Sequence, residues 1–174
     1  TLSPPALAVL TAALPDARRK LSPRGLDTWL QGVGALHRLG RGDDPVIAWV
    51  EATPQLAQDL GEDVLTDFLP ICLGFASRTS GVVITRILTN APMAARRLGD
   101  GKLFLSYLRF LEHLLAKAPR AMRPMLDQLG NLLDVLTLGG LRRWADWGVD
   151  AHRTNYPELE RYFSLASEES RAIV

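Results

Sequence analysis

Hydrophobic residues recur every three or four positions along most of this 174-residue chain, which is the spacing of one face of an α-helix. The segment 119–136 shows the pattern most clearly, because its apolar residues follow one another at spacings of 3, 1, 3, 3, 1 and 3. These residues are Met122, Met125, Leu126, Leu129, Leu132, Leu133 and Leu136. No segment alternates apolar and polar residues as a half-buried β-strand does. The pattern therefore predicts an all-α protein.

Helix start and stop signals divide the chain into about ten short helices. Ser22, Asp44 and Thr53 each precede a proline, which is the order expected for a capping residue and the first residue of a helix. The signals predict helices over 5–14, 23–39, 45–60 as a pair broken at Thr53, 62–77 with a kink at Pro70, 81–90, a restart at Pro92, 102–118, 119–136, 141–153 and 157–165, and a last one cut off by the chain end.

Residues 54–63 and 92–101 are offset copies of each other that share Pro, Ala, Leu and Gly at an offset of 38 residues. A repeat of this length is typical of helical pairs, such as HEAT repeats, that stack to bury their apolar faces. A third copy does not follow in register. We therefore predict one helical domain over 1–174, built as a short irregular helical-repeat solenoid or an orthogonal bundle.

Composition excludes several classes of protein. Lys and Arg number 20 against 19 Asp and Glu, so the net charge of +1 gives no global field toward nucleic acid or an anionic membrane. The single Cys72 excludes a disulfide framework and a four-cysteine zinc site. No apolar run approaches the ~18 residues of a membrane span, and we expect a cytoplasmic protein. Because the chain begins at Thr1 rather than Met, we expect it to be an excised part of a longer protein.

The residues needed for catalysis do not occur in a recognisable arrangement. None of the three histidines, His37, His113 and His152, has a second ligand at metal-binding spacing. The acidic pairs at 43–44, 62–63 and 168–169 fall in the first turns of predicted helices, where the helix dipole favours negative charge. Neither a phosphate loop nor a nucleophile elbow is present. We expect a protein that is not an enzyme and holds no cofactor or metal ion.

Arginines and tryptophans are the candidate partner-binding residues. If successive repeats stack, the arginines at 96–97 and 120–123 form one ridge that meets an acidic partner. Trp144 and Trp147 diverge by about 60° around a helix, so we expect one to be core and the other to be an interface anchor. The full set is Arg96, Arg97, Arg120, Arg123, Arg142, Arg143, Trp144 and Trp147.

Two stretches carry a family signature: Arg-Thr-Ser-Gly at 78–81 followed by Pro-Met-Ala-Ala-Arg-Arg-Leu-Gly at 92–99, and the tryptophan-containing run at 136–152 followed by 162–171. Over most of 25–174 the chain resembles the N-terminal helical region of the NorD/CbbO group, which are von Willebrand A domain adaptors of MoxR-type AAA+ ATPases. The von Willebrand A domain itself lies outside this chain, and with it the metal-ion-dependent adhesion loop.

The resemblance implies a scaffold that docks the adaptor onto a NorQ- or CbbQ-like ATPase or presents a target enzyme. The family's targets are Rubisco, which is reactivated, and nitric oxide reductase, which is activated. The residues themselves leave a second reading open, a nucleic-acid-binding helical repeat that uses the arginine ridge. A small hydrolase is a third and weaker reading, because no nucleophile and base can be paired.

Overall fold

The computed structural model describes residues 1–117, 119, 122–132, 136–137 and 139–144. These residues form helices joined by short turns, and none of them lies in a β-strand, which confirms the all-α prediction. The helices are α1 (Pro4–Lys20), α2 (Pro23–Arg38), α3 (Asp44–Leu60), α4 (Asp63–Arg78), α5 (Gly81–Leu98), α6 (Gly101–Lys117) and α7 (Met122–Leu132), and a short helical stretch covers 139–144.

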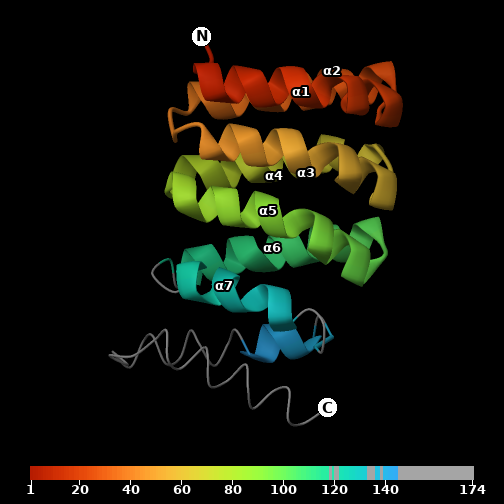
Figure 1. Cartoon of the computed structure of the whole chain (residues 1–174). Coiled ribbons are helices and arrows are strands. Elements are labelled where there is room, and N and C mark those ends of the chain that lie inside the picture. Colours follow the sequence, from red (N-terminus) through yellow and green to blue (C-terminus); the bar gives the residue numbers. More distant parts are fainter. Residues whose placement is uncertain (118, 120–121, 133–135, 138, 145–174) are drawn as a thin grey trace. The chain divides into compact units, whose positions relative to one another are not determined.

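The chain divides into two compact units, residues 1–105 and residues 106–174. In the first unit the helices form two layers (Figure 1): α1, α3 and α5 lie side by side, and α2 and α4 lie behind them. Neighbours within each layer pack on each other, α1 on α3, α3 on α5 and α2 on α4. This unit is therefore a stack of helical hairpins, the kind of arrangement that the 38-residue repeat predicts.

Six long helices cover residues 4–117, where the sequence signals predict about eight shorter ones. The predicted breaks at Pro54 and Pro92 are wrong, because both prolines lie inside helices, in α3 and α5. Pro15 likewise lies inside a helix, α1, which continues past the predicted end at Leu14. An interior proline leaves the carbonyl four residues earlier without its amide donor. In α3 a substitute donor offsets that loss.

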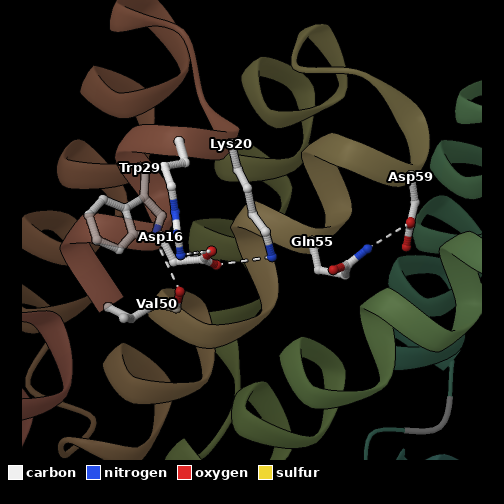
Figure 2. Close-up of polar contacts among 7 residues, drawn as sticks. Asp16, Lys20, Trp29, Val50, Gln55 and Asp59 are labelled. Carbon is white, nitrogen blue, oxygen red and sulfur yellow. Dashed lines mark hydrogen bonds and ion pairs between the residues drawn. The ribbon is translucent and has the colours of Figure 1, made fainter. Parts of the chain in front are cut away.

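The substitute donor in α3 is a tryptophan side chain. Pro54 lacks the amide that would bond the Val50 carbonyl, and the indole Nε1 of Trp29 donates to this oxygen instead, at 3.3 Å (Figure 2). In return, the indole Nε1 of Trp49 donates to the Trp29 carbonyl at 2.9 Å. Both indoles are fully buried. The two tryptophans thus tie α2 to α3 and satisfy the oxygen that Pro54 leaves free.

Close packing around Trp49 requires a glycine on α2. A Cβ atom at Gly32 would lie 2.2 Å from Cε2 of the Trp49 ring, far inside van der Waals contact. On its other face the Trp49 ring stacks on Phe68, with ring centroids 5.6 Å apart and nearly parallel planes. Phe68 in turn contacts Phe104, also with ring centroids 5.6 Å apart. Aromatic rings from α3, α4 and α6 therefore form one continuous core.

Consecutive hairpins are joined through their N-cap residues. Ser3, the N-cap of α1, donates its hydroxyl to the Asp43 carboxylate, which is the N-cap of α3. Ser22, the N-cap of α2, donates its amide and its hydroxyl to the Glu62 carboxylate, the N-cap of α4. Both pairs are 40 residues apart in sequence. The first two hairpins are thus stacked in the same register in both layers.

These bonds revise the role predicted for the acidic pairs. Asp43 and Glu62 make no side-chain cap bond to their own helices, and Asp44, the predicted cap, is the first residue of α3. Hydrogen bonds from Ser22 lower the pKa of the Glu62 carboxyl. The predicted N-cap at Ser22 is confirmed, since its hydroxyl oxygen accepts from the Gly25 amide at 3.2 Å.

The second unit contains the apolar stripe of 119–136. The helix here, α7, runs from Met122 to Leu132, inside the predicted segment. Met122, Met125, Leu126 and Leu132 are buried, as the spacing predicts for the inner face of a helix. Leu141 and Trp144 are buried in the helical stretch that follows. The predicted helices at 157–165 and beyond lie outside the described residues.

Candidate interaction surfaces

The predicted contact residues fall into two groups, one in each unit. Arg96 and Arg97 are exposed in the last turn of α5, and Arg142 and Arg143 are exposed in the helical stretch 139–144. Arg123 lies in α7, whereas Arg120 and Trp147 lie outside the described residues.

Trp144 is a core residue, with 1% of its surface exposed. Of Trp144 and Trp147, one was expected to be a core residue, and Trp144 is buried in this way. A docking role for Trp144 would require the surrounding helix to open. Any anchor in this stretch therefore has to come from other residues, of which Arg142 and Arg143 are exposed.

The basic turn of α5 places two arginines beside an apolar side chain. Arg96 and Arg97 follow Met93 by three and four positions, so all three side chains lie on one side of the last helical turn. Among the described residues, these three line a surface pocket of about 410 Å³. The helix ends at Gly99, which has the left-handed φ of 63° typical of a C-terminal cap. The turn thus combines an apolar thioether with two cations.

The corresponding turn of α1 contains a carboxylate among its cations. Asp16 directly follows the interior proline, and its carboxylate pairs with Arg19 at 3.2 Å and with Lys20 at 3.0 Å (Figure 2). The hydrogen bond from Lys20 is the largest of the effects that lower the pKa of Asp16. Asp16 offsets only part of the charge of Arg18, Arg19 and Lys20, so this turn stays basic.

The same turn is acidic in α3 and basic in α5. In α3, Gln55 follows the proline, and its amide donates to the Asp59 carboxylate at 2.8 Å (Figure 2). In α5, Met93 follows the proline, so no carboxylate lies one turn before Arg96 and Arg97. Sequence reasoning missed this comparison, although aligning the chain on Pro15, Pro54 and Pro92 reveals it.

The other surface pockets contain fewer charged side chains that are available to a partner. A pocket of about 180 Å³ lies between the first turns of α2 and α4, where Ser22 already holds the Glu62 carboxylate. A pocket of about 170 Å³ between α3 and α5 is lined mainly by small residues, among them Ala48 and Ala52. Cys72 is buried, and burial raises the pKa of its thiol well above the usual value, which keeps it protonated.

Within the part of the chain that the structure describes, no three His, Cys, Asp or Glu side chains gather as metal ligands do. None of the described helices has the length and apolarity that crossing a bilayer demands. Comparisons with protein-family models, with curated proteins and with solved structures give no match. The site is therefore defined by its own geometry: an exposed basic turn on a stack of helical hairpins.

Proposed function

We propose that this protein is a helical interaction module that binds another protein through the basic turn of α5. The observation that carries the proposal is the exposure of Arg96 and Arg97 around a pocket lined by Met93. Arginine combined with an apolar neighbour is the composition of protein-binding hot spots. The module contributes binding free energy and orientation and catalyses no reaction itself.

The resemblance to the NorD/CbbO group supports a particular partner, a MoxR-type AAA+ ATPase of the NorQ or CbbQ kind. In this proposal the module is part of a cytoplasmic adaptor. It docks the adaptor onto the ATPase ring, and the motor then acts on the target enzyme, either Rubisco or nitric oxide reductase. An acidic surface on the ATPase is the expected complement of Arg96 and Arg97, because opposite charges speed encounter and fix the orientation of the two proteins.

The experiment is capture of the co-expressed ATPase by the tagged chain. We expect the wild-type chain to retain the ATPase and Arg96→Glu with Arg97→Glu to weaken binding by ~2 kcal/mol or more, the loss typical of a hot spot. Arg38→Glu is the matched control, since Arg38 is an exposed arginine at the end of α2 in the other layer. Failure of the wild-type chain to retain the ATPase, or equal loss in the control, would contradict the proposal.

The exposed arginines also favour a second candidate, binding to nucleic acid phosphates. Phosphate binding weakens steeply as salt rises, because bound counterions are released from the nucleic acid. A duplex oligonucleotide titrated at low and at physiological salt separates the two candidates. Saturable binding with a steep salt dependence that Arg96→Glu abolishes would favour nucleic acid. Absence of binding at low salt would exclude nucleic acid and favour binding of a protein partner as the function of this turn.

A further inference from the structure

The first hairpin exposes two large apolar side chains, one on each of its helices. Leu7 of α1 is 51% exposed and Leu30 of α2 is 44% exposed, while Leu10 and Leu14 are half-buried. In α1 only Ala6 and Ala17 are buried, compared with ten residues of α3. Stacks of helical repeats bury such apolar side chains between neighbouring helices.

The exposed leucines lie off the buried faces of their helices. Ala6 and Ala17 are the buried residues of α1. Leu7 lies about 100° from Ala6 and about 80° from Ala17 around the helix, on the flank of that buried face. The same reasoning applies to α2.

Thr28 faces α4, because it lines the pocket beside Glu62. Leu30 lies two positions further, about 200° around the helix, and so points away from α4. Leu7, Leu10, Leu14 and Leu30 together are called the end face below.

The repeat register shows what kind of neighbour the end face fits. Ser3 bonds Asp43 across an offset of 40 residues, so Leu10 and Leu14 correspond to Val50 and Pro54 of α3. Those two residues are buried within the stack. The end face is thus the position at which a further helix would pack in the same way. Leu7, Leu10 and Leu14 are spaced by three and four residues, the spacing of a seam between two helices.

We propose that a second copy of this chain covers the end face, with the two α1 helices packed antiparallel about a two-fold axis. Charge complementarity favours this arrangement. The last turn of α1 carries Arg18, Arg19 and Lys20, and its first turn lies beside Asp43, with Asp44 next in the chain. A two-fold axis places the basic end of each α1 beside the acidic end of the other, and the leucine seam meets an identical seam.

Arg18 is the cation available for such a contact. Asp16 already pairs with Arg19 and Lys20, whereas Arg18 is exposed and forms no ion pair within the described residues. Asp44 is likewise exposed at the first position of α3. A contact between Arg18 of one copy and Asp44 of the other fixes the antiparallel orientation, since a parallel pair would bring like charges together.

Sedimentation equilibrium over a concentration series measures the association directly. We expect the wild-type chain to be a dimer that dissociates on dilution, and Leu7→Glu to raise the dissociation constant at least about tenfold, or 1.4 kcal/mol. Val82→Glu is the matched control, because Val82 is 55% exposed on α5, away from the end face. Circular dichroism confirms that each variant keeps its helical content, and Leu30→Glu replaces Leu7→Glu if the latter fails to fold.

Charge reversal tests the orientation. Arg18→Glu is expected to weaken the dimer, and adding Asp44→Arg in the same chain is expected to restore it. A wild-type chain that stays monomeric at every concentration would overturn the proposal and leave the end face to a helix of another protein. Equal dissociation by Val82→Glu would overturn the choice of the end face, and failure of the double reversal would overturn the antiparallel arrangement.

Discussion

Replacing Gly32 by alanine is expected to destabilise the protein even though alanine is the better helix former. The added Cβ would lie 2.2 Å from Cε2 and 2.4 Å from Cζ2 and Nε1 of the Trp49 ring. Ordinary contact begins near 3.4 Å, so the indole has to move by about 1 Å in a core that is packed like a crystal. Trp49 is fully buried, with its ring stacked on Phe68.

The magnitude follows from three contributions. Overpacking in a core costs about 1–3 kcal/mol. Displacing the Trp49 ring also weakens the bond from its Nε1 to the Trp29 carbonyl, worth about 0.5–1.5 kcal/mol. Against these losses, alanine gains about 1 kcal/mol over glycine in a helix interior. The expected net loss for Gly32→Ala is about 2 kcal/mol.

Gly34, two residues along the same helix, provides the matched control. A Cβ there would meet only the Arg38 Nη1 atom at 3.5 Å, an ordinary contact with a flexible side chain. Gly34→Ala is therefore expected to stabilise the protein by up to about 1 kcal/mol. Denaturant unfolding followed by circular dichroism measures both changes. Wild-type stability for Gly32→Ala, or a loss of similar size for Gly34→Ala, would show that the close approach of Trp49 to α2 is not what constrains this position.

Two further outcomes follow from the hydrogen bonds of the first unit. Trp29→Phe removes the donor to the Val50 carbonyl and is expected to lower the free energy of unfolding by about 1–3 kcal/mol, because a buried acceptor is left unsatisfied. Pro54→Ala restores a backbone donor and should recover part of this loss in the double variant. Purely additive losses would contradict the assignment. Because the pKa of Glu62 is lower in the folded state, its stabilising contribution is present above the unfolded pKa and is lost as pH falls through the folded value. Stability measured against pH should therefore fall in this acidic range in the wild type and fall less in Glu62→Gln; parallel profiles would exclude Glu62 as the group responsible.

Local signals predicted the helices whose ends are set by local bonds. The stretch predicted as 62–77 is α4, Asp63–Arg78, and that predicted as 102–118 is α6, Gly101–Lys117. At the start of α6 the Asp100 carboxylate accepts from the Leu103 amide at 3.0 Å, a contact within one turn. Such bonds involve only neighbouring residues, and so the sequence around them is sufficient to predict them.

The failures share one physical cause. A proline after Thr53 or Ala91 fits a helix start as well as a helix interior, and local sequence does not separate the two. In α3 the difference depends on the Trp29 indole, 21 residues away from the carbonyl that it satisfies. The candidate site shows the same limit. The arginines of the α5 turn were predicted from composition, but the burial of Trp144 depends on tertiary packing that spacing alone does not determine.

The interior prolines give the first unit a fixed frame on which surface charge varies. Pro15, Pro54 and Pro92 all lie in the second half of three stacked helices. The next turn carries Asp16 among three cations in α1, an acidic Gln55–Asp59 pair in α3 and two arginines in α5. The backbone beneath these side chains is helical in all three cases. Charge can therefore change from hairpin to hairpin without altering the core. A repeat protein can in this way present one hairpin to a partner, which is the role proposed for α5 and its arginines.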